Sequence, residues 1–366
     1  MTTWSPQQNE ALAKAGAWLR MRYAPTFYLA GYAGTGKTTL AIHLAQHAKG
    51  KVAFAAFTGK AARVMRSKGC LGARTIHSLI YSTEVDPING DVKTQLLPPS
   101  ALEDYSLIII DECSMVNEEI GQDLLSFGKP ILVLGDPAQL PPVSGGGYFT
   151  SRDPDYMLTE VHRQAAESPI VRLATAIREG RQFPKSFCQP GLIITARDDL
   201  NPSLVTSADA VLVGRNNTRQ RYNKRLRELL GKNGELPDVG EPLICLRNDT
   251  FKKIYNGDIL TVAKRRSLKN KIKLWMSDPE GERETTMVDV LPDFFRDDVE
   301  AAKLPYSQLR STQQFTFGYA ITCHKSQGSQ WSNVCVFDES RAFRADASRW
   351  LYTAVTRASD HLTLVV

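Results

Sequence analysis

The chain has 366 residues, of which 42% are hydrophobic and 23% are charged, and its formal net charge is +6. This composition is typical of a soluble protein of two or three domains and excludes a disordered chain, a collagen-like repeat and a small disulfide-bonded scaffold. No apolar run approaches the roughly 20 residues of a membrane helix, and the N-terminus does not resemble a signal peptide. The six cysteines form no CxxC pair, so we expect reduced thiols in a cytoplasmic protein without a membrane partner.

Short apolar runs alternate with helical patterns in the first 150 residues. The runs lack a polar alternation, which is typical of strands buried on both faces of a parallel sheet. The predicted strands are residues 27–34, 52–58, 107–112 and 131–136. The predicted helices are Thr38–Lys49 and Lys60–Ser67. This order predicts a doubly wound α/β domain.

The second half repeats this pattern with an interruption. Its predicted strands are residues 210–214, 333–337 and 362–366, and its predicted helices are 167–180, 216–231 and 347–358. Short β-like runs between polar turns at residues 259–315 predict a small all-β insertion. A smaller interruption at residues 80–100 contains Asn89-Gly90, which is a strong β-hairpin signal.

A complete phosphate-binding motif, G-x-x-x-x-G-K-[ST], runs from Gly31 to Thr38 between a predicted strand and a predicted helix. Its glycines let backbone N–H groups surround phosphates at a helix N-terminus. Lys37 would then reach the β- and γ-phosphates, and the Thr38 hydroxyl would bind Mg²⁺. A glycine-rich loop without a ligand is the alternative interpretation.

Two further strand ends carry polar groups of the kind that ATP hydrolysis needs. Asp111 and Glu112 end the third predicted strand, where Asp111 would hold Mg²⁺ and Glu112 would polarise the attacking water. Gly135-Asp136 and Gln139 follow the next strand, and Gln139 could sense the γ-phosphate or orient the water. An adjacent base for water favours a hydrolase over a kinase.

With these motifs in this order, the chain resembles a superfamily 1 helicase of the 5′→3′ branch, the RecD-like group that includes the phage Dda-type enzymes. The resemblance covers nearly the whole chain in the family's order. Besides the phosphate loop and Asp111-Glu112, it rests on Trp4–Gln8, Phe57–Ala62, Thr75–His77, Gly135–Pro142, Glu160–Gln164, Asn256–Asp258, Ala320–Ser329 and Tyr352–Ala358.

The resemblance implies an α/β fold with two RecA-like P-loop motor domains. The first would comprise residues 1–79 and 101–165 with a hairpin insert at 80–100, and the second residues 166–258 and 316–366 with an SH3-like β insert at 259–315. It also implies an ATP- and Mg²⁺-dependent 5′→3′ single-stranded DNA translocase and helicase that hydrolyses ATP at the cleft between these domains. Further implied properties are a monomer, binding of tailed duplex DNA, a single-strand-binding or replisome protein as partner, and a host cytoplasm if the gene is from a phage.

The resemblance also assigns residues to roles. Catalysis would involve Lys37, Asp111, Glu112, Gln139 and the arginine-finger positions Arg163 and Arg357. Nucleotide contacts would come from Gln8, which would read adenine, and from Gly31, Gly34, Thr35, Gly36, Lys37, Thr38, Thr39 and Gly328, with Thr38 and Asp111 as the metal ligands. Nucleic acid would contact Thr58, Lys60, Thr75, His77, Asn256, Thr322, His324 and Lys325.

Charge distribution supports a polyanion partner for the second half. Residues 1–165 hold 15 basic and 15 acidic side chains, whereas residues 210–275 hold 16 basic and 6 acidic ones. Acidic residues predominate at 278–300, and they would neutralise part of this charge. The hairpin tip expected at Pro87–Gly90 lacks an aromatic ring that could separate strands.

Three alternatives stay open at this point. An RNA translocase would use the same backbone contacts, because those contacts do not distinguish the sugar. A small-molecule P-loop kinase and a non-catalytic nucleic-acid-binding module fit fewer of the motifs.

Overall fold

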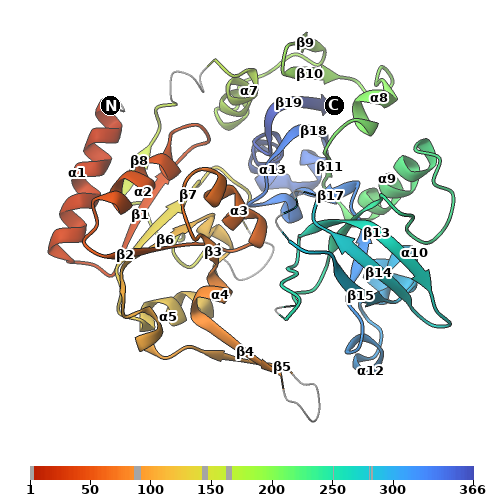
Figure 1. The fold of residues 1–366 in the computed structure, drawn as a ribbon. Helices are drawn as coiled ribbons and strands as arrows, with labels where there is room; N and C mark the ends of the chain where they lie inside the picture. Colours follow the sequence, from red (N-terminus) through yellow and green to blue (C-terminus); the bar gives the residue numbers. More distant parts are fainter. Residues whose placement is uncertain are drawn as a thin grey trace. The chain divides into compact units, whose positions relative to one another are not determined.

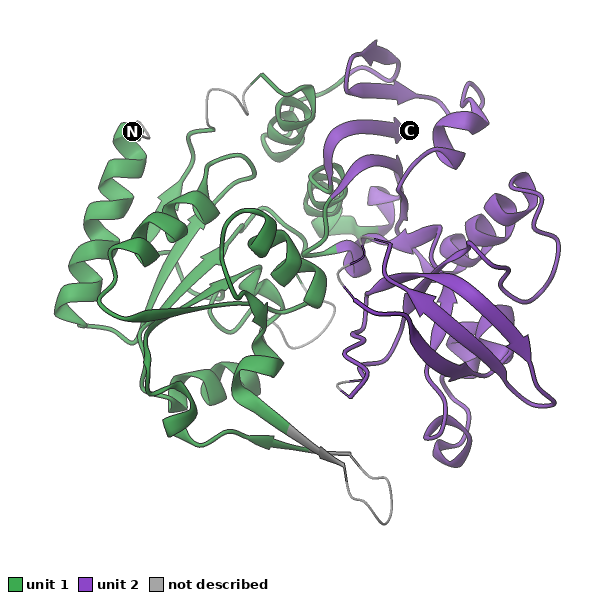
Figure 2. Cartoon of the chain, viewed as in Figure 1, with its two compact units in different colours: residues 1–183, 327–330, 343–357 green, residues 184–326, 331–342, 358–366 purple. Residues whose placement is uncertain are grey.

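The computed structural model describes residues 4–85, 92–141, 147–161, 167–249, 251–279, 281 and 283–366. The chain forms two compact units, which are coloured separately in Figure 2. Unit 1 contains residues 1–183, 327–330 and 343–357, and unit 2 contains residues 184–326, 331–342 and 358–366. Within the described ranges, the helices are too short or too polar to span a membrane.

A six-stranded parallel sheet forms the centre of unit 1 (Figure 1). Its strands are β1 (Thr26–Gly31), β2 (Lys51–Ala56), β3 (Arg74–Thr75), β6 (Tyr105–Asp111), β7 (Ile131–Gly135) and β8 (Tyr156–Leu158). Their order is β3-β2-β6-β7-β1-β8. Because neighbouring parallel strands end at one edge of the sheet, the segments that follow β1, β6 and β7 meet there.

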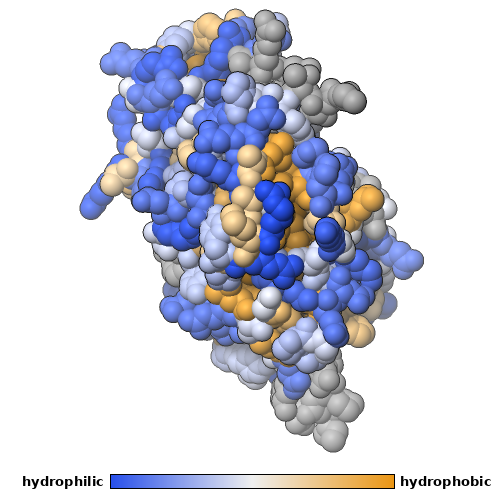
Figure 3. Space-filling view, turned by 90° about the vertical axis from the view of Figure 1, so that its left-hand side faces the viewer, coloured by the Kyte–Doolittle hydropathy of each residue, from blue (hydrophilic) through white to orange (hydrophobic). Residues whose placement is uncertain are grey.

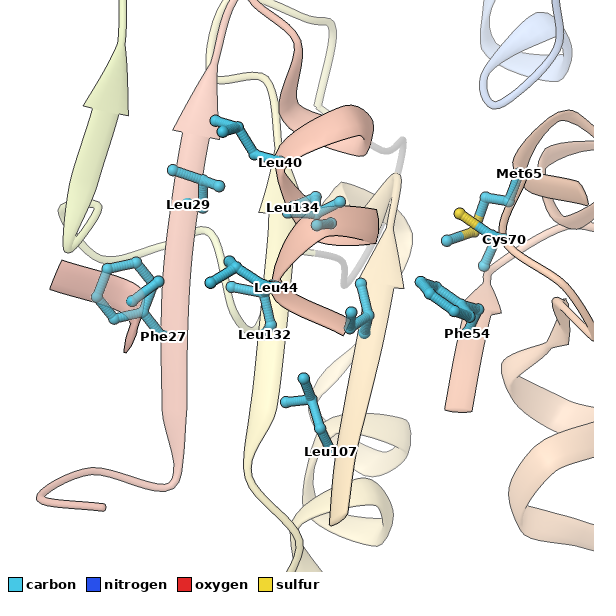
Figure 4. Packing of buried hydrophobic residues seen from close by; sticks show 14 of the residues in the cluster. Phe27, Leu29, Leu40, Leu44, Phe54, Met65, Cys70, Leu107, Leu132 and Leu134 are labelled. Atoms are coloured by element: carbon cyan, nitrogen blue, oxygen red, sulfur yellow. The ribbon is translucent and has the colours of Figure 1, made fainter. Parts of the chain in front are cut away.

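Helices cover both faces of this sheet, as the apolar runs predict. On one face α1 (Pro6–Met21), α2 (Lys37–Gln46) and α3 (Gly59–Ser67) pack on alternate residues of the strands. On the other face α4 (Ile76–Ile80) and α5 (Glu118–Ser126) pack on the intervening residues. Figure 4 shows the first of these clusters, with Leu40 and Leu44 of α2 near Leu29 and Leu132 of the strands. This doubly covered sheet holds the strand ends in fixed positions.

Helix α1 is present in the structure, but the sequence patterns did not predict it. Its start is a capping box in which the Ser5 hydroxyl accepts a hydrogen bond from Gln8 N and the Gln8 side chain accepts one from Ser5 N, followed by Pro6 at the first turn. Ala11, Ala15 and Trp18 face the core. The face of the molecule on which α1 lies is mainly hydrophilic, with smaller hydrophobic areas between (Figure 3).

A two-stranded antiparallel hairpin, β4 (Tyr81–Val85) and β5 (Val92–Leu96), follows α4. Tyr81 is paired with Leu96 at its base. The predicted tip, Pro87–Gly90 with its Asn-Gly turn, lies outside the described residues. The remaining elements among the described residues of unit 1 include η1 (Pro99–Leu102), η2 (Cys113–Met115), α7 (Pro169–Arg178) and α13 (Ala347–Val355), and the last two pack together.

Unit 2 contains a second six-stranded sheet, in the order β17-β11-β18-β19-β10-β9. Its strands are β9 (Phe187–Gln189), β10 (Leu192–Thr195), β11 (Ala210–Val213), β17 (Ala320–Thr322), β18 (Trp331–Phe337) and β19 (Ala358–Val365). The strands are parallel except for the β9–β10 pair. Helices α8 (Pro202–Thr206) and α9 (Asn216–Leu229) and the turn η3 (Cys323–Ser326) complete this part, and η4 (Ser340–Asp346) begins in unit 2 and continues into unit 1.

A five-stranded antiparallel sheet forms the rest of unit 2, in the order β15-β14-β13-β12-β16. It consists of β12 (Pro242–Cys245), β13 (Ile259–Ser267), β14 (Ile272–Ser277), β15 (Thr286–Val290) and β16 (Phe315–Phe317), with short helices α10 (Asp293–Arg296), α11 (Asp298–Ala301) and α12 (Tyr306–Leu309). The expected insert, 259–315, contains β13 to β15. Strand β12 pairs with β13 and β16 although the prediction assigned it to the α/β domain, because Leu243 and Cys245 face this sheet's core.

Candidate active site

The phosphate-binding loop lies between β1 and α2 at the edge where the strands end. Gly34 and Gly36 adopt positive φ angles of 79° and 85°, which side chains with a Cβ rarely adopt. A Cβ on Gly31 would lie 2.6 Å from Thr35 Oγ1, so this position has no room for a side chain. Gly36 caps α2 without a side-chain hydrogen bond, which leaves the first N–H groups of the helix available to an anion.

Lys37 and Thr38 face the acidic end of β6. Lys37 Nζ donates hydrogen bonds to Gly31 O (2.6 Å) and Tyr32 O (3.1 Å), and Thr38 Oγ1 donates to Asp111 Oδ2 (3.1 Å). Asp111 is partly buried; desolvation, then the charge of Glu112, raises its pKa, and the charge of Lys37 opposes this. The loop therefore supplies a cation beside a partly buried carboxyl group.

The Thr38 and Asp111 oxygens suit an octahedral metal ion. Adjacent ligands of Mg²⁺ at 2.0–2.1 Å lie about 2.9 Å apart, which is close to the 3.1 Å between Thr38 Oγ1 and Asp111 Oδ2. Among the described residues, no group of three or more His, Cys, Asp or Glu side chains is placed to hold a metal. A site with so few protein ligands is typical of Mg²⁺ that binds together with substrate phosphates.

These groups line a pocket of about 690 Å³ in unit 1. Ten of the predicted catalytic and nucleotide-contacting residues line it: Gly34, Gly36, Lys37, Thr38, Thr39, Asp111, Glu112, Gln139, Gly328 and Arg357. Gly328 approaches the helix-capping residue Thr58 closely, since a Cβ there would lie 3.1 Å from Thr58 Oγ1 and 3.0 Å from Ala61 Cβ. The sequence thus brings segments more than 200 residues apart into one pocket.

Glu112 and Arg357 stand side by side in this pocket. Arg357 is buried, with Nη1 4.0 Å from Glu112 Oε1 and 3.2 Å from Ser329 O, and its Nε donates to Thr353 O. Glu112 follows Asp111 with a left-handed φ of 52°, and its backbone N–H donates to Asp111 Oδ1 (2.9 Å). A guanidinium is therefore fixed next to the carboxylate predicted to activate water.

Gln139 and Asp136 follow β7, the strand between β6 and β1. Gln139 Oε1 is buried and has no hydrogen-bond partner among the described groups. Asp136 accepts hydrogen bonds from Tyr352 Oη (2.8 Å) and Ala138 N (3.0 Å), and burial raises its pKa. An amide oxygen without a partner at a pocket wall fits the predicted role of Gln139 in sensing a ligand or a water.

The sequence assigns no role to Tyr352 of α13, although this residue begins the motif Tyr352–Ala358. Its hydroxyl donates to Asp136 and accepts a hydrogen bond from Ala33 N (2.8 Å), and burial raises its pKa. The next residue, Thr353, accepts from Leu140 N (2.7 Å), and Gln327 Nε2 donates to Leu140 O (2.5 Å). The segment after β7 is thus held by side chains from two late motifs.

Two predicted residues are placed differently or not described. Gln8 is buried, and its amide donates to Thr35 O (3.2 Å) and accepts from Ser5 N (3.1 Å), while Trp4 lines the pocket. The adenine contact of Gln8 stays a prediction. Arg163, the second predicted arginine finger, lies outside the described residues.

In unit 1 the residues predicted to contact nucleic acid lie at the starts of short helices. Thr58 caps α3, and Thr75 caps α4 through a hydrogen bond from Ser78 N (3.1 Å). Lys60 lies in the first turn of α3. His77 is half-buried between the rings of Phe57 and Tyr81, and desolvation lowers its pKa. This packing gives His77 a structural role whether or not it contacts nucleic acid.

In unit 2 the predicted contacts come together around η3. Lys325 Nζ donates to Asn256 Oδ1 (3.2 Å), and Thr322 Oγ1 accepts from Lys325 N (3.4 Å). His324 lies in the same turn. Burial, followed by the charge of Arg219, lowers the pKa of Lys325.

Among the described residues, part of the basic stretch of α9 is held in ion pairs with little exposure. Arg219 pairs with Asp298 and Arg227 with Glu241, in each case with at least one N···O distance of 2.7 Å and little exposure. Lys271 of the antiparallel sheet pairs with Asp289. Acidic residues of 278–300 therefore neutralise part of the basic charge, as expected from the sequence.

Comparison with known proteins gives two family matches. A model described as an AAA domain matches residues 4–188, slightly more than half of the chain. A model described as a UvrD-like helicase C-terminal domain matches residues 317–365.

Two curated proteins and one solved structure are similar over most of this chain. It is 28% identical to the ATP-dependent RecD2 DNA helicase of Deinococcus radiodurans, over 91% of this chain and 46% of that protein, so it spans about half of that relative's length. It is 25% identical to the RecBCD enzyme subunit RecD of Mycolicibacterium smegmatis, over 92% and 67%. The structure of Bacteroides Pif1 bound to ssDNA covers the whole chain and 93% of that protein, with a TM-score of 0.59 and 18% identity, which shows a shared fold.

Proposed function

The chain belongs to the AAA-domain family, within the RecD-like group of superfamily 1 helicases, and we propose that it is an ATP-dependent DNA helicase that moves 5′→3′ along single-stranded DNA. One observation carries the proposal. Lys37, Thr38, Asp111, Glu112 and Arg357 line a single pocket although they come from segments far apart in sequence. A lysine, a hydroxyl, two acids and an arginine at a helix N-terminus are the groups that phosphoryl transfer to water requires.

Each residue has a distinct task in this proposal. The N–H groups at the start of α2 and Lys37 bind the phosphates of ATP, and Thr38 and Asp111 hold Mg²⁺, which neutralises phosphate charge when bound. Glu112 accepts a proton from the attacking water. Arg357, 4.0 Å from Glu112, stabilises the charge that spreads over the phosphate oxygens, and Gln139 orients the water.

The finer features of the proposal come from the resemblance and the relatives. We propose that the two six-stranded sheets are RecA-like motor domains, with the β4–β5 hairpin as the first insert and the antiparallel sheet as an SH3-like second insert. We further propose a monomer that binds single-stranded and tailed duplex DNA. The Deinococcus relative is named as a DNA helicase, which favours DNA over RNA as the polymer.

ATPase assays with three polymers test the function. The rate of hydrolysis is measured with single-stranded DNA, single-stranded RNA and no polymer, at two salt concentrations. We expect strong stimulation by DNA. Stimulation by RNA alone would support the RNA translocase instead, and phosphate transfer to a small acceptor without any polymer effect would support a kinase.

Unwinding assays test the direction of movement. Duplexes with a 5′ or a 3′ single-stranded tail are incubated with the protein and ATP, and we expect opening of the 5′-tailed duplex. Selective opening of the 3′-tailed duplex would reverse the proposed polarity.

A further inference from the structure

A second pocket, of about 470 Å³, lies within unit 2 along one side of α9. Its other walls are the loop at residues 232–235, the α10 region and β16. Neither Asn256, Thr322, His324 nor Lys325 lines it, so it is distinct from the residues that the resemblance assigns to nucleic acid.

Several basic side chains at this pocket form no ion pair with the described residues. Among the described residues, Arg221, Lys224 and Lys232 line it and have no carboxylate within ion-pair distance. The other charged residues of the wall are mostly paired, as Arg219 is with Asp298 and Arg296 with Glu235. Unpaired positive charge therefore exceeds unpaired negative charge along the described pocket wall, which favours an anionic ligand.

Arg219 gives a second, independent indication of a ligand. Its side chain is 2% exposed, and its Nη2 donates to both oxygens of Asp298 at 2.7 Å. Its Nε is buried and has no partner among the described groups, although Arg219 lines the pocket. A buried guanidinium N–H without an acceptor costs free energy that an anion in the pocket would recover.

The aromatic residues that line the pocket indicate which part of a nucleic acid could bind. Phe294, Phe295 and Phe317 line it but are 0%, 8% and 6% exposed, so their rings present no face on which a base could stack. Recognition would therefore use phosphate groups and not bases, which makes it independent of sequence. Asn223 of the pocket wall exchanges two 2.9 Å hydrogen bonds with the backbone of Ala320 in β17, and β17 continues directly into η3, so the pocket lies near the predicted contacts around η3.

We propose that this pocket binds phosphate groups of a single-stranded nucleic acid and extends the predicted contacts of Asn256 and Lys325 onto α9. The inference rests on the proposed function, because it names an additional part of the polymer site. Free phosphate compounds share this chemistry and are a separate arm of the test.

The first arm compares two sets of α9 variants in the full-length chain. Arg221→Gln/Lys224→Gln removes two rim cations, and the matched control Arg225→Gln removes a cation on the same helix that pairs with Glu228 and lies outside the pocket. Binding of a fluorescent 15-mer of thymidine is measured between 50 and 200 mM salt. We expect the double variant to bind about tenfold more weakly and its salt slope to fall by about 1.4, because each single-strand phosphate contact contributes about 0.7.

The second arm follows the Arg219 Nε–H signal by ¹⁵N NMR during titration with the same oligonucleotide and with pyrophosphate. We expect a shift with the oligonucleotide at concentrations near its Kd. A shift with pyrophosphate only, or a double variant whose salt slope equals that of the control, would overturn the proposal.

ATPase activity separates this inference from the proposed function. The double variant should reach the wild-type kcat at saturating DNA, because its residues lie outside the nucleotide pocket. If DNA stimulates the wild-type ATPase and the salt slopes of all variants are equal, only the α9 inference fails. If the wild type neither binds DNA nor responds to it, the proposed function fails as well.

Discussion

The Lys37 ammonium group lies inside the glycine-rich loop. Its Nζ donates hydrogen bonds to the carbonyl oxygens of Gly31 and Tyr32, within reach of any phosphate bound at the start of α2. We expect Lys37→Ala to lower kcat for ATP hydrolysis by at least about 10²-fold, as for loss of one electrostatic catalytic group. Binding of single-stranded DNA should remain, and Lys49→Ala, an exposed cation near the same helix, is the control. Wild-type turnover by Lys37→Ala would refute the assigned site.

Arg357 has a structural role in addition to its proposed catalytic one. Two backbone oxygens anchor its guanidinium 4.0 Å from Glu112. We expect Arg357→Ala to lower kcat by about 10³-fold, as for an arginine finger, and to weaken ATP binding far less. Steady-state kinetics and direct nucleotide binding measure the two effects, and thermal unfolding checks the fold. Equal losses in affinity and in kcat/KM would indicate a ground-state contact.

Asp136 makes stability depend on pH. Desolvation raises its pKa, so the folded chain keeps this proton to a higher pH than the unfolded chain, whose carboxyl titrates near 3.9. The contribution of Asp136 to stability therefore falls as pH rises through this window. In Asp136→Asn the amide oxygen can replace only one of the two carboxylate oxygens, which accept separately from Ala138 N (Oδ1) and Tyr352 Oη (Oδ2), and the loss of the other hydrogen bond does not depend on pH. We expect the unfolding free energy of wild type minus that of Asp136→Asn to decrease from about pH 4 to pH 7; an increase would contradict the assignment.

The side chains that line the proposed nucleotide pocket could be picked out from the sequence because local sequence determines their geometry. The spacing from Gly31 to Thr38 requires a tight turn and a helix start, and Asp111 follows an apolar strand. The hydrogen bonds of Tyr352 could not be predicted in this way, because its partners Ala33 and Asp136 lie 319 and 216 residues away in the sequence. Only folding brings a phenol hydroxyl between these two strand ends.

At the scale of elements, buried strands were the most predictable because their apolar runs are short and continuous. Strand order was not, since no local signal indicates that β7 lies between β6 and β1. Helix α1 has a clear start signal at Ser5-Pro6 but a weakly segregated apolar face. Strand β12 shares its apolar character with the strands of the parallel sheet, so composition alone did not distinguish which sheet it joins.

Helix α13 joins two strand ends through one hydroxyl. Tyr352 bonds the phosphate-binding loop at Ala33 and the segment after β7 at Asp136. Tyr352→Phe keeps the ring and removes both hydrogen bonds. We expect kcat to fall by about tenfold with little change in KM, because a neutral hydrogen bond contributes about 0.5–1.5 kcal/mol and positions catalytic groups. Tyr306→Phe, at an exposed position in unit 2, is the control. An unchanged kcat would show that packing of α13 alone is sufficient.

Across the whole molecule, the uneven distribution of charge predicts how salt affects DNA binding and ATP hydrolysis. Residues 1–165 carry no net charge, and residues 166–366 hold 30 basic and 24 acidic side chains. Polymer binding by exposed cations is screened by salt, whereas the partly buried Arg357–Glu112 pair of the nucleotide pocket is screened much less. With about four phosphate contacts, a fourfold rise in salt should weaken single-strand binding by roughly 50-fold. We therefore expect the DNA concentration for half-maximal ATPase stimulation to rise by about this factor between 50 and 200 mM salt, while kcat at saturating DNA changes less than twofold. A parallel loss of kcat would show that salt acts on the nucleotide pocket itself.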